Sequence, residues 1–310
     1  MSLLFPEIQH EDTEFARRPT RPKPVPLPWI GGKCRLAKTI HSLAAPHKIR
    51  VIPFAGSLGE LWTWPFYKIQ EVVSDIDPLV ANFYWCMQDY STVQEITREI
   101  LLTPMSRHTH HYHISQYQNL LSTTENAKEL ARHLRNCPNK QLAISLLASL
   151  RMAIAGDYKV FRPCSILARR GIERCISGLV GAALSLNILH RRIKSVEVLC
   201  EDASKVITTY DSKETLFYCD PPYPTDSRYS KEKLYAFEMT KEQHLQLLEL
   251  LCQVKGKVML STYPNQLYDD FLGAKGWRRV EVKVNNIILN HKPDLQYRQP
   301  HKSEIIWMNY

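Results

Sequence analysis

Five short runs of β-branched and aromatic residues constrain the fold of this 310-residue chain more than any other feature. Several of the runs are separated by segments with helical periodicity, and the runs lie at residues 49–54, 70–76, 195–200, 215–219 and 256–263. Strands that alternate with helices favour a mainly parallel sheet whose two faces are covered. The sequence therefore predicts an α/β fold.

A long helical stretch interrupts this pattern. Between Tyr90 and about Lys194 the strand signal disappears, and segments such as "AKELARHLRNC" and "KQLAISLLASLRMAIA" have helical periodicity. We expect a helical insertion at 91–194 between the two halves, 28–90 and 195–310, of one α/β domain. Residues 1–27 form a basic, proline-rich arm, because "RRPTRPKPVPLP" is incompatible with a helix.

The composition narrows the range of partners. Forty Lys and Arg against 31 Asp and Glu give a net charge of +9, which favours a polyanionic partner, with nucleic acid ahead of an anionic membrane surface. No apolar segment is long enough to span a bilayer, and the acidic start of the chain lacks the form of a secretion signal. We expect a cytoplasmic protein. The eight scattered cysteines form no C-x-x-C pair, and neither they nor the histidine run "RHTHHYH", which we interpret as a polar loop, predicts a metal site.

The stretch "FYCDPPYPTDSR" ends one of the predicted strands abruptly. Pro221 and Pro222 lack the amide that a central strand needs, so the strand must stop at Asp220. A stiff turn then holds the Asp220 carboxylate and the Tyr223 ring at the carboxyl end of a strand, where open α/β sheets usually bind ligands. A simple loop stop explains the two prolines equally well.

The segment "VIPFAGSLGELW" runs from a strand through a glycine-containing loop towards a helix. Gly56 lets backbone amides approach a ligand closely, although the full G-x-G-x-x-G spacing is missing. In "VVSDID", Asp75 lies at the tip of the following strand, where a carboxylate can accept hydrogen bonds from ribose hydroxyls. The alternative is that Asp75 caps the helix that starts near Pro78.

Two further segments contribute to the same predicted pocket. Asp202 follows the strand at 195–200 and is placed to accept a hydrogen bond from an adenine amino group, with Glu201 the less favoured residue. In "PWIGGKCRL", Cys34 stands where a Walker A loop needs Ser or Thr, so binding of a nucleoside triphosphate is disfavoured. Trp29 and Lys33 of this segment suit a zwitterionic amino-acid group instead.

The order of these motifs resembles the Dam-like DNA adenine-N6 methyltransferases, from "PWIGGK" through "PFAGSLGELW", "SDIDPLVANFY", "CEDAS" and "CDPPY" to "VMLSTYPNQLYDDF". The resemblance spans most of residues 28–271. It implies a Rossmann-like methyltransferase sheet with an inserted helical target-recognition domain, and S-adenosylmethionine as cofactor. It also implies that the cofactor pocket is lined by Trp29, Lys33, Phe54, Gly56, Asp75, Asp202 and Asp220.

The same resemblance makes residues Asp220, Pro221, Pro222 and Tyr223 the catalytic loop. The adenine N6 lone pair is delocalised into the ring, so acceptors for both amino hydrogens, Asp220 and the Pro221 carbonyl, favour the nucleophilic geometry. Tyr223 is expected to stack on a base that has left the duplex. We expect direct methyl transfer without a covalent enzyme intermediate or a metal.

The insertion carries the basic residues expected to contact double-stranded DNA, although a solvated helix face explains about half of them equally well. They are Lys159, Arg162, Arg169, Arg170, Arg174, Arg191, Arg192 and Lys194. The family's N-G-L-C-R-like target loop is missing, which leaves the recognition sequence and any partner nuclease open. RNA adenine methylation and a catalytically silent DNA-binding module remain alternatives, whereas Asp220 disfavours cytosine-N4 and protein-glutamine methylation, for which Ser or Asn is usual.

Overall fold

The computed structural model describes residues 25, 27–63, 68–118, 120, 124–154, 157–163, 168–169, 172–227, 235–284 and 302–310. The predicted basic arm lies almost entirely outside these residues, and so does Arg170.

A seven-stranded sheet forms the centre of the described chain, in the order β10-β11-β9-β8-β1-β2-β7. Its strands are β1 (Ile49–Ile52), β2 (Gln70–Ser74), β7 (Glu197–Leu199), β8 (Thr215–Cys219), β9 (Lys257–Thr262), β10 (Arg278–Val284) and β11 (Lys302–Met308). Strands β7, β2, β1, β8 and β9 are parallel, whereas β11 pairs antiparallel with both β9 and β10. The mainly parallel α/β sheet is therefore confirmed.

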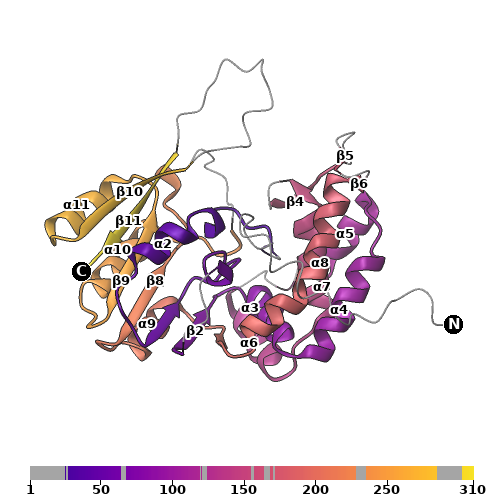
Figure 1. The fold of residues 1–310 in the computed structure, drawn as a ribbon, viewed down its shortest axis with the longest axis horizontal. Helices are drawn as coiled ribbons and strands as arrows, with labels where there is room; N and C mark the ends of the chain where they lie inside the picture. The colour runs from indigo at the N-terminus through magenta and orange to yellow at the C-terminus, as the bar shows by residue number, and fades with distance from the viewer. Residues whose placement is uncertain are drawn as a thin grey trace, which may run out of the picture.

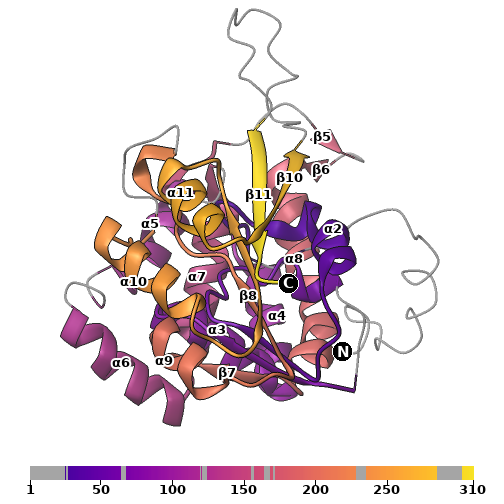
Figure 2. The same ribbon diagram turned by 90° about the vertical axis from the view of Figure 1, so that its left-hand side faces the viewer.

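Helices cover both faces of this sheet (Figures 1 and 2). The helices are α2 (Ala37–Leu43), α3 (Pro78–Gln88), α4 (Tyr90–Leu102), α5 (Arg107–Ser115), α6 (Thr124–Asn136), α7 (Lys140–Met152), α8 (Arg174–Ile193), α9 (Ala203–Thr209), α10 (Lys241–Leu251) and α11 (Gln266–Ala274). Short 3₁₀ turns lie at η1 (Lys33–Arg35), η2 (Leu61–Thr63) and η3 (Thr225–Ser227). Figure 2 shows α10 and α11 on one side of the sheet and α2 on the other.

Side chains that alternate along the strands divide the core into two clusters. In β8, Leu216 and Tyr218 belong to the cluster that includes α2 and α3, whereas Phe217 and Cys219 belong to the cluster formed with α9, α10 and α11. All four side chains are fully buried. This is the packing of a central parallel strand that is buried on both faces, and it explains the uninterrupted apolar run in the sequence.

The predicted insertion folds into helices α4 to α8. Helices α4, α5, α7 and α8 stand together on the right of Figure 1, and α6 lies beside α3. The insertion also holds the short strand pairs β3 (Ala153–Ile154) with β4 (Asp157–Phe161), and β5 (Ala168–Arg169) with β6 (Ile172–Glu173). Helix α3 contacts α6, α7 and α8. One hydrophobic cluster continues from the sheet through α3 into α7 and α8, so the core is not interrupted at residue 91.

Each of the five predicted strands is confirmed, within three residues at either end. The predicted helix start at Thr240 is also confirmed, because its hydroxyl accepts from the Gln243 amide in a complete capping box. The interpretation of residues 107–113 as a polar loop was wrong. This segment is helix α5, which begins at the Ser106 cap and buries His110 and His113.

A buried ion cluster joins the insertion to the sheet. Glu71, near the start of β2, accepts a 2.6 Å hydrogen bond from Arg50 of β1 and two hydrogen bonds from Arg192 near the end of α8. Arg50 is 0% exposed, Arg192 is 4% exposed and Glu71 is 7% exposed. Both Arg50 and Glu71 are second residues of their strands, so the carboxyl end of α8 is fixed at the amino edge of the sheet.

None of the helices in the described ranges has the length and apolar character that crossing a membrane requires.

Candidate active site

The carboxyl ends of β1, β2 and β8 open into one cavity of about 910 Å³. After β1 the chain moves to β2 and β7 on one side and returns to β8 on the other, so the strand order reverses between β1 and β8. Open α/β sheets bind ligands at this kind of switch point. All of the residues predicted from sequence to bind cofactor or to form the catalytic loop line this cavity, which brings segments from residue 29 to residue 223 together.

The glycine loop after β1 approaches Trp29 very closely. Gly56 has φ +46°, and a Cβ added there would lie 2.9 Å from the Trp29 Nε1 atom. Only glycine fits this conformation and this gap without displacing the indole ring. The adjacent Leu58 also has a positive φ of 50°, which is uncommon for a residue with a side chain. The loop thus contains two residues with positive φ at the edge of the cavity.

Asp75 ties the tip of β2 to this loop. Its Oδ2 atom accepts from the Gly56 amide at 2.8 Å, and its Oδ1 atom accepts from the Asp77 amide at 2.9 Å. Burial raises the pKa of Asp75 despite these hydrogen bonds. The alternative interpretation of Asp75 as the helix cap was wrong, because Asp77 caps α3 by accepting from the Leu79 amide.

Asp202 lies at the rim of the same cavity and is also the N-cap of α9. Its Oδ1 atom accepts from the Ser204 amide at 2.9 Å. The neighbouring Glu201 instead pairs with Lys205 at 2.8 Å and is not among the residues that line the cavity. This arrangement agrees with the sequence-based preference for Asp202.

The predicted catalytic loop begins where β8 ends, at Cys219. Asp220, Pro221, Pro222 and Tyr223 all line the cavity. The Tyr223 ring is buried and meets the Tyr263 ring edge-on, with centroids 4.6 Å apart. The loop therefore presents one carboxylate and one fixed aromatic ring to the cavity, as the sequence predicted.

Lys33 has partners that the sequence did not indicate. Its Nζ atom lies 2.8 Å from Asp220 Oδ2 and 3.3 Å from Glu304 Oε1, and it donates to the Gly31 carbonyl at 2.6 Å. Burial alone would lower the pKa of Lys33, but the charges of Asp220 and Glu304 outweigh burial and raise it. The ammonium is thus directed at the catalytic loop in this structure, and its predicted contact with the cofactor stays a prediction.

Two buried acids of this site, Glu60 and Glu304, were not predicted. Glu60 is 4% exposed and lines the cavity, and burial together with the charge of Asp220 raises its pKa to about 7. Glu304 accepts a hydrogen bond from the Tyr223 hydroxyl, and burial raises its pKa too. Glu60 belongs to the quoted glycine segment, so its position in the sequence was a usable signal, whereas Glu304 lies far from every motif.

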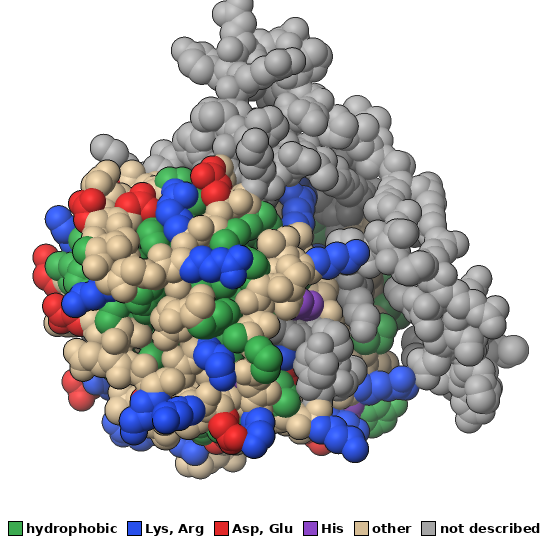
Figure 3. Space-filling model, turned by 60° about the vertical axis from the view of Figure 1, so that its left-hand side comes forward, with side chains coloured by type: hydrophobic (Ala, Val, Ile, Leu, Met, Phe, Trp, Pro, Cys, Tyr) green, Lys and Arg blue, Asp and Glu red, His purple; other side chains and the backbone are tan. Residues whose placement is uncertain are grey.

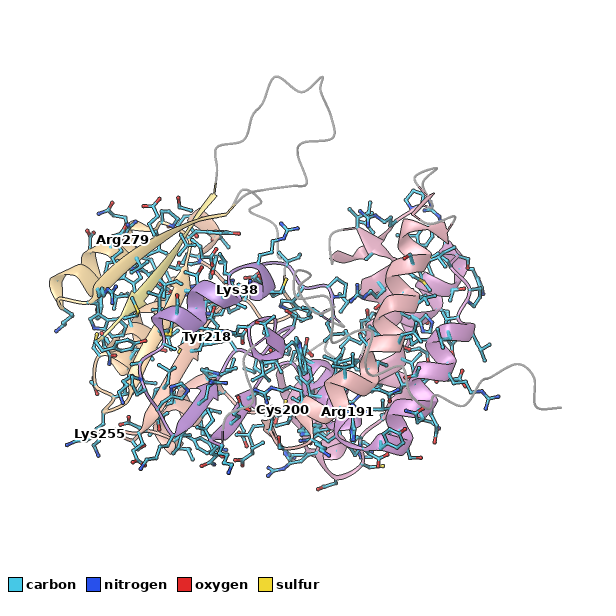
Figure 4. The ribbon with its side chains drawn as sticks, viewed as in Figure 1. Lys38, Arg191, Cys200, Tyr218, Lys255 and Arg279 are labelled. Carbon is cyan, nitrogen blue, oxygen red and sulfur yellow. The ribbon has the colours of Figure 1, made fainter. Side chains whose placement is uncertain are left out.

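The predicted DNA contacts are separated by the length of α8. Arg162 is exposed at the end of β4, and Arg169 and Arg174 belong to β5 and to the first turn of α8. Arg191 lies at the other end of α8 (Figure 4). A helix rises 1.5 Å per residue, so about 25 Å separates the backbones of Arg174 and Arg191. Lys159 lies on β4 and Lys194 directly follows α8.

One predicted DNA contact needs correction. Arg192 is buried, and both terminal nitrogens of its guanidinium group bind Glu71. The side chain is therefore committed to the ion cluster beneath the sheet and is not available to a phosphate.

Comparison with known proteins agrees with this arrangement. Residues 182–286 match the sequence model of the D12 class N6 adenine-specific DNA methyltransferase, while no match is found among curated proteins. The matched segment includes Asp202, the loop from Asp220 to Tyr223 and the strands from β7 to β10. The match confirms the resemblance found from the motifs, and it supports methylation of adenine N6 in DNA as the general chemistry.

Proposed function

We propose that this chain is a site-specific methyltransferase that acts on N6 of adenine in double-stranded DNA and uses S-adenosylmethionine. One observation carries the proposal: a single cavity joins the glycine loop and Asp75 to the loop of Asp220 and Tyr223. A carboxylate that orients a ribose and a carboxylate that orients an amino nitrogen are the two groups that this reaction needs in one place.

The residues of the cavity fit the proposed cofactor. The volume of about 910 Å³ lies at the upper end of the range for small-molecule sites. Gly56 adds no side chain beside the Trp29 ring, and the Asp75 carboxylate has acceptor capacity beyond its hydrogen bonds from backbone amides. Asp202 at the rim offers a further acceptor for the adenine of the cofactor. The bound cofactor supplies an electrophilic methyl group on a sulfonium centre.

The substrate end of the cavity is built to orient an amino group. Asp220 accepts one N6–H and the Pro221 carbonyl accepts the other, which shifts electron density from the adenine ring towards the nitrogen. With the cofactor bound, its methyl group would be transferred to N6, and the proton that N6 loses would pass by way of these acceptors to water. Tyr223, fixed by its contact with Tyr263, offers an aromatic surface to the flipped base.

Duplex DNA is proposed to contact the end of the insertion that carries β4, β5 and β6. The described basic residues on the face shown in Figure 3 are spread among neutral, acidic and apolar side chains. The proposal rests instead on the predicted contacts Lys159, Arg162, Arg169 and Arg174, which belong to or adjoin these strands and the start of α8. The insertion, 91–194, then acts as the target-recognition part, and 28–90 with 195–310 form the catalytic part.

Arg162→Ala is expected to weaken duplex binding and to reduce the slope of log K against log salt by about 1, because one phosphate contact is lost. Lys255→Ala is the control, since Lys255 is exposed just before β9, at the amino edge of the sheet and away from the insertion (Figure 4), and its loss is expected to leave the slope unchanged. Fluorescence anisotropy with a labelled duplex across a salt series measures both. Equal slopes for the two variants would place the DNA elsewhere.

Asp75→Ala is expected to weaken binding of S-adenosylmethionine at least 10-fold, because a charge-assisted hydrogen bond contributes about 1.5–3 kcal/mol. Calorimetry on the folded variant measures the change. Duplex affinity should change much less. An Asp75 variant with the cofactor affinity of the parent protein would remove this residue from the site.

Nucleoside analysis tests the reaction itself. Duplex DNA, an RNA of the same sequence and a protein extract are each incubated with the purified chain and methyl-labelled cofactor. We expect label only in the hydrolysed DNA, as N6-methyl-2′-deoxyadenosine. Label in RNA, in cytosine or in protein would contradict the proposed substrate, and a folded chain that binds DNA without incorporating label would be a binding module.

A further inference from the structure

Strand β11 places the carboxylate of Glu304 beside the catalytic loop. Strand β11 is antiparallel to β9, and Ile305 pairs with Thr262, the final residue of β9. The start of β11 therefore lies at the sheet edge where the parallel strands end. Ile306 and Met308 are core residues of the cluster on the α2 and α3 side, and Glu304 lies two residues before Ile306 on the same face of β11.

Glu304 is 4% exposed and contacts two groups of the site. It accepts the hydrogen bond of the Tyr223 hydroxyl, and its Oε1 atom lies 3.3 Å from Lys33 Nζ. Lys33 also pairs with Asp220 at 2.8 Å, and its ammonium lies 4.9 Å from the centroid of the Tyr223 ring. One cation is thus shared by the buried Glu304 and the partly exposed Asp220, and Glu304 also holds the aromatic ring.

We propose that Glu304 is a positioning residue of the methyl-transfer site, which shares the Lys33 ammonium with Asp220 and fixes the Tyr223 ring through its hydroxyl. The inference rests on the proposed function. Asp220 must offer a lone pair to the N6 amino group, and a lysine bound to Asp220 alone would compete with that group for the same oxygen. A second carboxylate on Lys33 lowers the cost of displacing the ammonium from Asp220.

Two variants separate the effect of the Glu304 charge on Lys33 from the effect of its hydrogen bond with the Tyr223 hydroxyl. In Glu304→Gln the amide oxygen can still accept from the Tyr223 hydroxyl, but the side chain no longer attracts Lys33. In Tyr223→Phe the hydroxyl is lost, while the charge on Glu304 stays. Glu304→Gln is therefore expected to lower kcat on the order of 10²-fold with little change in cofactor affinity, whereas Tyr223→Phe lowers kcat by a smaller factor. Glu304→Asp should recover part of the loss, because it restores the charge.

A second measurement uses the unliganded full chain. In the parent protein Glu304→Gln removes a partner of Lys33 and should lower the urea midpoint of unfolding. In a Lys33→Met background the buried Glu304 and the partly exposed Asp220 have no cation between them, so Glu304→Gln should raise the midpoint instead. This change of sign is expected only if Lys33 and Glu304 interact.

Two results would overturn the inference: parental kcat in folded Glu304→Gln, or an effect of the same sign on the midpoint in both backgrounds. These results are distinct from a failure of the proposed function, which would appear as the absence of N6-methyl-2′-deoxyadenosine in DNA treated with the parent protein. If the parent protein fails in that way, the role in methyl transfer is rejected too, while the midpoints still report the contact between Lys33 and Glu304. The single variant Glu304→Gln leaves the Lys33 ammonium with one carboxylate, whereas the double variant Lys33→Met/Glu304→Gln has no ammonium at this position. If the single variant fails to fold and the double variant folds, this result supports the interaction between the charges of Lys33 and Glu304.

Discussion

Asp220→Ala is expected to lower the rate of methyl transfer to adenine by 10²-fold or more while the protein still folds and binds cofactor and DNA. Removal of a single preorganised hydrogen-bonding group from a site of this kind typically costs 10²–10³ in kcat. The fold should survive because Lys33, the buried partner of Asp220, keeps Glu304 3.3 Å away as a counter-charge. Loss of the carboxylate therefore leaves no buried cation without an acid.

Single-turnover kinetics with excess enzyme over duplex separates this chemical defect from weaker binding. Asp220→Asn is the matched control: its amide oxygen can still accept the N6–H assigned to Asp220, but without the negative charge that strengthens this hydrogen bond, so an intermediate rate is expected. Circular dichroism and calorimetry establish that the variants fold and bind cofactor. A parental rate in Asp220→Ala, or cytosine as the methylated base, would rule out the assigned role of Asp220.

Local sequence was sufficient to predict the ends of the strands that form the site. Two prolines after Asp220 had to end β8, and an acid after an apolar run had to stand at the tip of β2. The ligand-binding edge then followed from the parallel arrangement, because all of these strands end on the same side. That is why Asp75, Asp202 and Asp220 could be assigned to one pocket before their contacts were known.

The missed features depend on contacts between distant residues. Strands β10 and β11 were not predicted, although Val280, Val282 and Val284 alternate with polar residues in β10. The importance of Glu304 depends on the antiparallel register of β11 with β9, which no local pattern specifies. In the same way, the local sequence around Arg192 suggests an exposed side chain, because its buried partner Glu71 lies 121 residues earlier.

The start of helix α5 has a local sequence signal, the N-cap residue Ser106, which the interpretation as a polar loop did not include. Ser106 is a good N-cap, and its hydroxyl accepts from the Thr109 amide at 3.0 Å. His113 then packs inward, with its Nδ1 atom 3.2 Å from the Ser145 hydroxyl of α7, and burial lowers its pKa to about 4. A run of histidines looks polar, but neutral imidazoles can be buried when they have partners such as this hydroxyl.

The buried ion cluster is expected to be the largest single polar contribution to stability among the described residues. Glu71→Gln should lower the free energy of unfolding by about 3–5 kcal/mol, because it leaves Arg50 and Arg192 buried together without their counter-charge. Urea denaturation followed by circular dichroism measures this loss. Arg50 comes from the sheet and Arg192 from α8, so the same change should also loosen the carboxyl end of the insertion helix.

Glu214→Gln provides a matched control for Glu71→Gln. Glu214 pairs with Lys48 at the same amino edge of the sheet, but these side chains are 54% and 75% exposed. An exposed pair of this kind contributes about 0–1 kcal/mol. Cofactor affinity should stay unchanged in both variants, because the cluster lies at the edge opposite the cavity. We attribute the larger loss in Glu71→Gln to the burial of its partners and not to ion pairing alone. Equal losses of stability in the two variants would contradict this explanation, and with it the role of Glu71 in joining the insertion to the sheet.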